Sequence, residues 1–375
     1  MRLKAIILAI AFLFVASTGM VMAKSKFAPG AVYTMTNATS GNEVLAFKRS
    51  ANGSLTPAGA FATGGVGTGA GLGNQGGLIL SPNNRLLFVV NAGSDTISVF
   101  KVKPKSLTLI GVFNSGGEQP VSLTVYRNLL YVLNAGGADG GADNISGFKV
   151  MRDGTLSPLA GSSRPLSDAN TGPAQIAFTP YGNVLVVTEK ATNTIDTYVV
   201  DHSGLVSTGP TTFDSPGDTP FGFDFRKPNL LLVSEAAGGA ENASSVSSYM
   251  VYPDGDLALV SAAVPTRQTA ACWLLVTKDN HYAFTTNAGS ASISSYGITK
   301  YGYIYLLDAD GQAGIAGPGT IDMALTQNGR FLYALNSGDG SISAFRVKFR
   351  GQLMPLTVPI QVTGLPSGAN GLAAR

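Results

Sequence analysis

The stretch NAGSDTISVF, residues 91–100, decides the fold of this chain. Its Asn, Gly, Ser and Asp residues favour a tight turn, and Ile97, Val99 and Phe100 then resume an extended apolar pattern. The preceding run LLFVV, residues 86–90, consists of residues that are common in strands. The stretch therefore predicts the end of one strand, a short turn and a second strand.

Altered copies of this stretch recur along the whole chain. Each copy is preceded by two β-rich runs, such as QIAFT and NVLVV, and is followed by a turn and a fourth run, such as DGTLSPLAG. Successive copies end 47 to 53 residues apart, at Phe47, Phe100, Phe148, Tyr198, Tyr249, Tyr296 and Phe345. We interpret these aromatic residues as packing residues between neighbouring units. Four strands per unit without helical periodicity predict an all-β, seven-bladed propeller with four antiparallel strands per blade.

The two ends of the chain predict how the ring closes. AVYTMTN, residues 31–37, enters the first unit at its second strand, whereas ANGLAAR, residues 369–375, resembles an inner strand with no unit after it. We expect the C-terminal strand to complete the first blade, which removes the exposed sheet edges of an open array. Residues 24–375 are predicted to form this single domain.

The first 23 residues predict export. They have a basic start, an apolar run and small residues at Val21 and Ala23, which is typical of a signal peptide cleaved after Ala23. The alternative is an uncleaved membrane anchor. We expect a secreted or periplasmic monomer with no membrane contact after cleavage. A net charge of +3 gives no indication of nucleic-acid binding.

The last residues of the second strands predict a ring on one face of the disc. In antiparallel strands, this end lies beside the start of the inner strand. The ring is Asn37, Asn91, Asn134, Glu189, Glu235, Asn287 and Asn336, and the inner strands begin near Gly77, Ser122, Gln175, Gly222, Trp273, Asp322 and Gly371. We expect each Asn to bond the backbone of the turn that follows it.

Glu189 and Glu235 are the exceptions in this ring. With Asp322 they could form an acidic cluster at the mouth of the central channel, where like charges raise at least one pKa. The alternative is that each Glu bonds its own turn or is neutralised by Lys190 or Arg267. No cofactor is certain, although Ca²⁺ or another divalent cation could bind such carboxylates. His202 and His281 are not expected at the mouth, because their turns belong to the opposite face, and we interpret Cys272 as a small buried residue.

The segment GLGNQG, residues 71–76, formally matches a dinucleotide-binding pattern. It leads into a strand rather than opening a helix, so we interpret the glycine-rich region around it as a long connection between blades.

The motifs TEKATNTIDTY, TPFGFDF, TAACWLLVT, TTNAGSASISSY, TIDMAL and SGANGLAA resemble a secreted bacterial branch of the seven-bladed propeller lactonase family. That family includes 6-phosphogluconolactonase-like and carboxymuconate cyclase-like proteins. The resemblance implies lactone chemistry at the channel mouth. Members with a proposed mechanism use His, Arg and Glu there, and this chain has no His at the start of its inner strands.

Two functions follow from these observations. The first is a lactonase-type hydrolase that opens a non-phosphorylated lactone, with Glu189, Glu235 and Asp322 as catalytic residues. Its substrate would contact Gln175, Trp273, Arg267, Lys190, Asn287 and Asn336. The second is a non-catalytic propeller that binds a carbohydrate, a cell-envelope component or a protein partner through its long loops.

Overall fold

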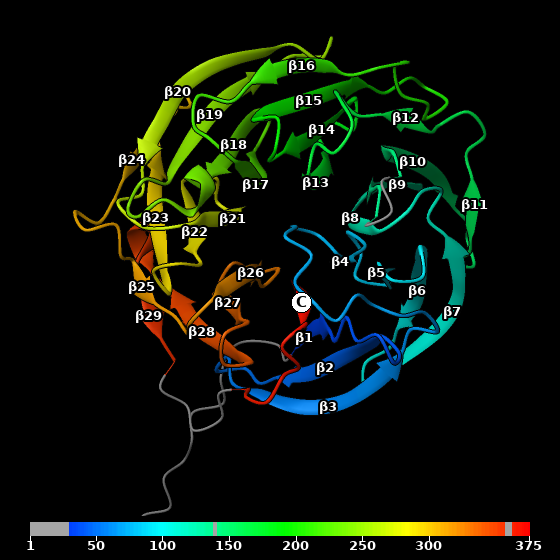
Figure 1. Ribbon diagram of the computed structural model, residues 1–375. Coiled ribbons are helices and arrows are strands. Elements are labelled where there is room, and N and C mark those ends of the chain that lie inside the picture. The colour runs from blue at the N-terminus through cyan, green and yellow to red at the C-terminus, as the bar shows by residue number, and fades with distance from the viewer. Residues whose placement is uncertain (1–29, 138–140, 357–361) are drawn as a thin grey trace, which may run out of the picture.

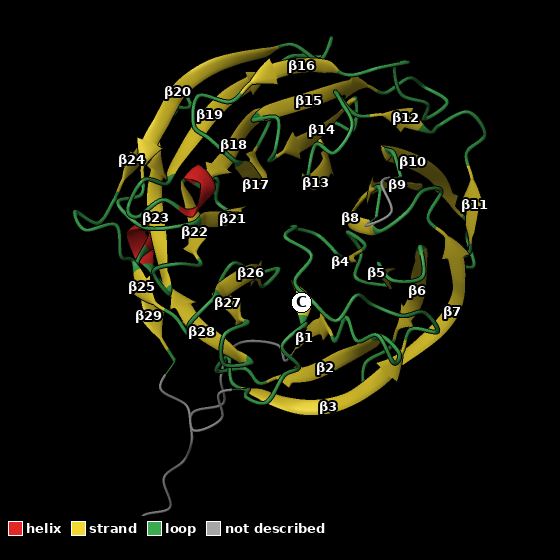
Figure 2. Cartoon of the chain, viewed as in Figure 1, coloured by secondary structure: helices red, strands yellow, loops and turns green. Residues whose placement is uncertain are grey.

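The computed structural model describes residues 30–137, 141–356 and 362–375. These residues form seven antiparallel sheets arranged as blades around a central axis (Figures 1 and 2). The predicted seven-bladed propeller is therefore confirmed. The proposed signal peptide lies outside the described residues. Within the described ranges, no helix is long and apolar enough to cross a membrane.

The first three blades are built as follows, each from its inner to its outer strand. Blade 1 contains β30 (Asn370–Ala374), β1 (Gly30–Met35), β2 (Glu43–Arg49) and β3 (Leu55–Ala62). Blade 2 contains β4 (Leu78–Leu80), β5 (Leu86–Asn91), β6 (Thr96–Val102) and β7 (Leu107–Asn114). Blade 3 contains β8 (Pro120–Tyr126), β9 (Leu129–Ala135), β10 (Asp143–Val150), β11 (Leu156–Pro158) and β12 (Arg164–Pro165).

The other four blades follow the same order. Blade 4 contains β13 (Pro173–Phe178), β14 (Val184–Glu189), β15 (Thr194–Val199) and β16 (Thr211–Asp214). Blade 5 contains β17 (Pro220–Arg226), β18 (Leu230–Glu235), β19 (Ser245–Val251) and β20 (Leu257–Pro265), with a 3-10 helix η1 (Ala237–Gly239) between β18 and β19. Blade 6 contains β21 (Ala271–Val276), β22 (Tyr282–Asn287), β23 (Ser292–Ile298), β24 (Ile304–Leu306) and β25 (Gly314–Ile315). Blade 7 contains β26 (Thr320–Leu325), β27 (Phe331–Asn336), β28 (Ser341–Val347), η2 (Phe349–Gly351) and β29 (Leu353–Pro355).

The ring closes as the sequence predicts. β30 pairs antiparallel with β1, with Tyr33 opposite Ala373 and Met35 opposite Asn370. In blades 3 and 6 the outer edge departs from the four-strand pattern, because two short strands separated by a loop pair with the third strand at different places.

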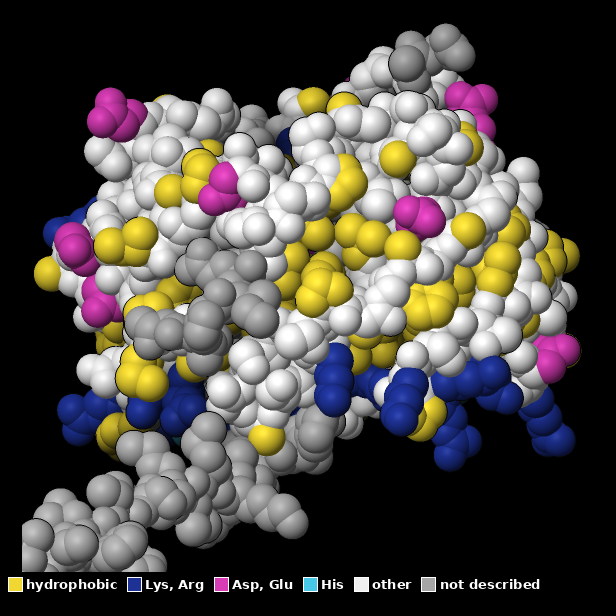
Figure 3. Space-filling model, turned by 90° about the horizontal axis from the view of Figure 1, so that it is seen from below, with side chains coloured by type: hydrophobic (Ala, Val, Ile, Leu, Met, Phe, Trp, Pro, Cys, Tyr) yellow, Lys and Arg dark blue, Asp and Glu magenta, His cyan; other side chains and the backbone are white. Residues whose placement is uncertain are grey.

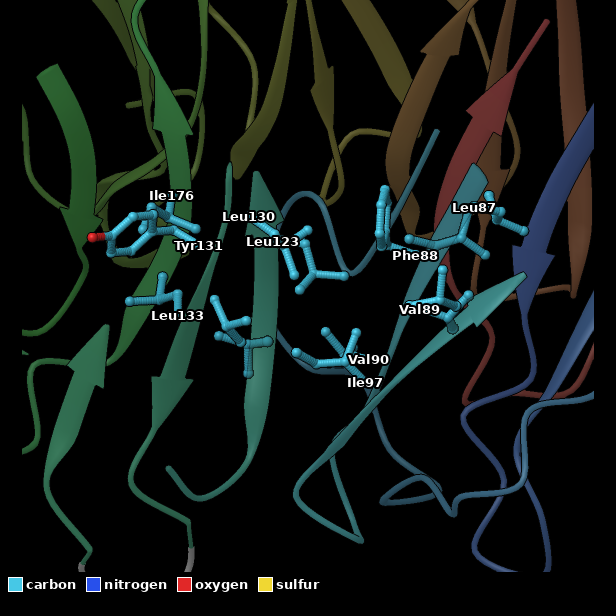
Figure 4. Close-up of a cluster of buried hydrophobic side chains, with 14 of the residues drawn as sticks. Leu87, Phe88, Val89, Val90, Ile97, Leu123, Leu130, Tyr131, Leu133 and Ile176 are labelled. Carbon is cyan, nitrogen blue, oxygen red and sulfur yellow. The ribbon is translucent and has the colours of Figure 1, made fainter. Parts of the chain in front are cut away.

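The core lies between the blades rather than in one central layer. The second strands are buried on both faces, as in β5 and β9, and their apolar side chains pack against the neighbouring blade (Figure 4). All of the recurrent aromatic residues are buried, with at most 5% of their surface exposed. Their predicted packing role is confirmed. Tyr198 also donates its hydroxyl to the carbonyl of Pro165 at 2.8 Å, which satisfies its buried polar atom.

Candidate functional site

The segment of residues 71–76, which we call the plug, lies at the mouth of the central channel and bonds the inner strands around it. It extends inward from the connection between blades 1 and 2, ahead of β4 (Figure 1). The Gln75 side chain bonds both backbone atoms of Leu274 in blade 6, at 2.9 and 3.0 Å. The Gln75 N–H donates to Ala174 in blade 4, and Ser122 of blade 3 donates to the Gln75 carbonyl at 2.6 Å. The predicted connection therefore also ties three inner strands together.

Two predicted substrate-binding side chains hold the plug. The indole nitrogen of Trp273 donates to the Asn74 carbonyl at 2.6 Å, and the Lys190 ammonium donates to the Gly73 carbonyl. The Phe221 ring lies between them, 4.9 Å from the Trp273 ring and 5.0 Å from Lys190 Nζ. Burial lowers the pKa of Lys190 to about 8.

Gln175 and Arg267 also have partners within the protein. Gln175 bonds both backbone atoms of Phe223 in blade 5, at 2.7 and 2.9 Å, and is buried. Arg267 is exposed and donates to the carbonyl of Ala309 at 2.8 Å.

Two Asn members of the ring, Asn287 and Asn336, bond side chains rather than the backbone of their turns. Asn287 Nδ2 donates to the hydroxyls of Ser292 and Ser294 at 3.0 and 2.9 Å. Asn336 donates in the same way to Ser341 and Ser343 of its own blade, at 2.8 and 2.9 Å. The expected backbone bonds are therefore wrong for these two residues. The amide instead links the second strand to the third.

Glu189 occupies the same position in blade 4 and is fully buried. Its carboxylate accepts the Ser167 N–H at 3.0 Å, the Ser167 hydroxyl, and the hydroxyls of Thr192 and Thr194 at 2.6 and 2.8 Å. Burial alone would raise the pKa of Glu189, but hydrogen bonds led by the one from Asp196 outweigh it and hold the pKa below its ordinary value.

Asp196 is the buried partner of Glu189 on the third strand. Burial and the neighbouring Glu189 carboxylate raise the pKa of Asp196 to about 8. The two shifts favour a protonated Asp196 beside an ionised Glu189 at neutral pH. The sequence does not reveal this partner, because Asp196 lies within a strand pattern, seven residues after Glu189.

Glu235 occupies the equivalent position in blade 5 and is also fully buried. It accepts hydrogen bonds from the hydroxyls of Ser245, Ser247 (2.5 Å) and Ser215 (3.1 Å), and from the Gly217 N–H at 3.2 Å. Here burial outweighs these donors, and the pKa of Glu235 is raised. The two Glu residues thus share a position but differ in basicity.

Asp322 lies apart from both Glu residues, on the inner strand of blade 7. Its Oδ1 accepts the Met323 N–H at 2.8 Å, and burial raises its pKa to about 8. Among the described residues, no group of three or more carboxylate, His or Cys side chains is placed to hold a metal ion. The expected acidic cluster of Glu189, Glu235 and Asp322 is therefore not formed as a cation-binding group.

One pocket lies directly above the Glu235 network. It has a volume of about 380 Å³ and is lined by Gly217, Asp218, Ala243, Ser245, Ala263 and Pro265, among others. Gly217 and Ser245 both bond Glu235, so they connect the pocket to the buried carboxylate. The sequence does not single out Ser245, because the AENASS segment, residues 240–245, stands out only by its small residues.

The two histidines lie elsewhere, as expected. His281 is in the turn between β21 and β22, 3.7 Å from Asp279, and His202 is in the turn after β15. Both turns are on the face opposite the plug. Cys272 is buried, and burial raises the pKa of its thiol to about 12.

The comparisons with known proteins agree with this architecture. Residues 26–163 match the family model described as "Lactonase, 7-bladed beta-propeller". No curated protein sequence matches the chain. The solved structures described below are at most 19% identical to the chain, so their likeness shows the fold alone.

Three of these structures illustrate the likeness. The periplasmic gluconolactonase of Pseudomonas aeruginosa is 16% identical, with a TM-score of 0.71 over 92% of this chain and 99% of its own. A candidate 6-phosphogluconolactonase of Bacteroides fragilis is 19% identical, with a TM-score of 0.71 over 92% of this chain and 98% of its own. A protein of Lactobacillus plantarum is 16% identical, with a TM-score of 0.72 over 93% of this chain and 100% of its own. The family match and the complete ring together confirm the resemblance of this chain to the seven-bladed propeller lactonases.

Proposed function

We propose that this protein hydrolyses a small, non-phosphorylated lactone in the pocket above Glu235. The observation that carries the proposal is the contact between the pocket-lining Ser245 hydroxyl and the buried Glu235 carboxylate. A hydroxyl beside a base that other groups orient is the arrangement of an activated nucleophile. Ser215, Ser247 and Gly217 orient the carboxylate here.

The reaction follows from these contacts. Ser245 Oγ attacks the lactone carbonyl and transfers its proton to Glu235, and the acyl–oxygen bond of the ring then breaks. Glu235 returns the proton to the departing ring oxygen, which leaves an acyl-Ser245 ester that carries the opened chain. Water, deprotonated by Glu235, hydrolyses this ester and restores the Ser245 hydroxyl.

The raised pKa of Glu235 suits this role better than the lowered pKa of Glu189, because a stronger base accepts a proton more readily. Only the ionised form of Glu235 can accept the proton. Activity should therefore fall with decreasing pH at values above the ordinary pKa of a glutamate. A pH profile of kcat/KM checks this expectation.

Matched substitutions test the assignment. Against a panel of non-phosphorylated lactones, Glu235→Gln and Ser245→Ala should each lower kcat/KM by a factor on the order of 10³. Glu189→Gln is the control, because it alters the same ring position but none of the residues that bond Glu189 lines this pocket. A Ser245→Ala enzyme with an unchanged rate would exclude the proposed nucleophile.

The plug favours a second function, a non-catalytic propeller that binds a carbohydrate, a cell-envelope component or a protein partner. Related propellers are expected to act at the mouth, but here the Trp273 indole N–H, the Asn74 carbonyl and the Gln75 amide are already bonded to other protein groups. A chain that hydrolyses no lactone but retains an envelope polysaccharide in a pull-down supports this second function.

We also propose export to the periplasm or the medium. The signal-like first 23 residues and the periplasmic gluconolactonase with the same fold support this location. Cell fractionation with N-terminal sequencing of the mature protein tests it, and a chain that keeps Met1 in the cytosol contradicts it.

A further inference from the structure

Basic residues gather on the face of the disc opposite the plug. This face carries the turns from inner to second strands and from third to outer strands. Figure 3 shows Lys and Arg side chains along its rim. Exposed cations in these turns are Arg85, Lys103, Lys105, Arg127, Arg152, Lys227, Lys278, Lys300, Lys348 and Arg350. We call this the basic face.

The turns of the basic face also carry exposed acids, but fewer than cations; they are Asp153, Asp201, Asp254, Asp256 and Asp279. Acids predominate on the plug face instead. Exposed acids in its loops are Glu118, Asp168, Asp214, Asp218, Glu241, Asp310 and Asp339. The modest net charge of +3 therefore hides a separation of charge across the disc. Such a field orients the molecule at a charged surface.

Aromatic side chains project from the same turns of the basic face. Phe349, Tyr301 and Tyr181 are 80%, 69% and 65% exposed. Lys300 Nζ lies 4.6 Å from the centre of the Tyr301 ring, and the Arg350 guanidinium lies 5.4 Å from that of Phe349. Aromatic rings beside cations are typical of side chains that sit at a membrane–water interface.

A pocket on the basic face is lined by both cationic and apolar side chains. It lies between blades 1 and 2 and has a volume of about 580 Å³, within the usual range of ligand pockets. Its lining includes the apolar side chains of Phe61 and Leu107 and the cationic side chains of Lys103, Lys105 and Arg375. Arg375 Nη2 donates to the Lys103 carbonyl at 3.2 Å, whereas its buried Nε has no hydrogen-bond partner. An anionic group with an apolar stem would satisfy both parts of this wall.

We propose that the basic face docks onto an anionic lipid bilayer and that this pocket receives one lipid headgroup. The cations attract the anionic surface, and the exposed rings enter its headgroup region. A sugar-phosphate polymer would leave the apolar wall without a partner, so lipid fits the pocket better. This departs from the expectation of no membrane contact, because the linear sequence does not show which turns share a face.

The position of Gly30 agrees with this orientation. β1 begins at Gly30 beside Arg375, so the preceding part of the chain joins the propeller at the basic face. The plug and the pocket above Glu235 then face away from the bilayer. Docking therefore leaves the proposed catalytic pocket open to solution.

Vesicle sedimentation with the full chain tests the proposal. The protein should bind vesicles of phosphatidylcholine mixed with phosphatidylglycerol, be released by high salt, and ignore phosphatidylcholine alone. Lys103→Gln with Lys105→Gln should weaken binding by about tenfold or more. Phe349→Ser with Tyr301→Ser should weaken it without changing its salt dependence.

A matched control changes the net charge equally on the other face. Asn170→Asp with Asn242→Asp adds two negative charges and so also lowers the net charge by two. Both are exposed left-handed positions that Asp tolerates, and binding should stay unchanged. Equal weakening by both pairs would overturn the docking surface. Equally strong binding to vesicles of phosphatidylcholine alone would also overturn the proposal, because an apolar segment rather than the basic face would then hold the protein on the vesicles. Equal binding to dextran sulfate that is insensitive to Phe349→Ser would overturn lipid in favour of a general polyanion.

Discussion

Blades 4 and 5 replace the same ring Asn with Glu, yet they accommodate the carboxylate differently. In both, the direction of hydrogen bonding is reversed, because hydroxyls donate to Glu where Asn would donate to hydroxyls. Opposite Val233 in blade 5 the third strand carries Ser247, whereas opposite Val187 in blade 4 it carries Asp196. The partner on the third strand thus decides whether the buried Glu joins a serine network or a carboxyl–carboxylate pair.

The largest expected effect is on stability, and it distinguishes removing the Glu235 carboxylate from replacing it by an amide. Glu235→Ala leaves three serine hydroxyls without their shared acceptor and should lower the free energy of unfolding by about 3 kcal/mol. Glu235→Asn should cost about 1 kcal/mol or less, because Ser245 and Ser247 occupy the positions that receive the Asn amide in blades 6 and 7. Urea unfolding of both variants measures the difference. Equal losses of unfolding free energy in the two variants would show that Ser245 and Ser247 do not accept an Asn amide as the matching serines of blades 6 and 7 do.

The next effect is the pH dependence of stability in blade 4. The folded-state pKa of Asp196 is raised to about 8, so the folded protein holds a proton that the unfolded chain releases. This contribution is fully present below the unfolded pKa and is lost as pH rises toward 8, at up to about 1.4 kcal/mol per pH unit. Glu189→Asn with Asp196→Ser recreates the Asn and Ser pairing of blade 2 and should remove this part of the slope.

Asp322 provides the internal control for that measurement. Its pKa is also raised to about 8 by burial, so it contributes a slope of the same sign in the converted protein. Asp322→Asn should remove that second part while keeping the acceptor for Met323. Unfolding free energies measured between pH 5 and pH 8 that show no change in slope for the blade 4 variant would contradict a protonated Asp196.

The contrast between these blades also shows what the sequence could predict. Repetition at a fixed spacing determined the blades, their closure and the ring position of each Glu, because strand order and antiparallel pairing follow from the repeat. It could not assign hydrogen-bond partners such as Asp196 or Ser245, since these depend on register across strands. The plug was read only as a connection, because glycine-rich segments carry no periodic signal for where they pack.

The smallest effect concerns the residue after each Glu, which is Lys190 in blade 4 and Ala236 in blade 5. Lys190→Met keeps an apolar stem near Phe221 but removes the donor to the Gly73 carbonyl, so it should cost about 1 kcal/mol. Because this bond holds the plug, hydrogen exchange at the Gln75 amide should quicken while exchange in blade 5 stays unchanged. If the Gln75 amide exchanges at its original rate in Lys190→Met, the contacts of Gln75 and Trp273 hold the plug by themselves. The lysine of blade 4 would then be no more important to the mouth than the alanine of blade 5.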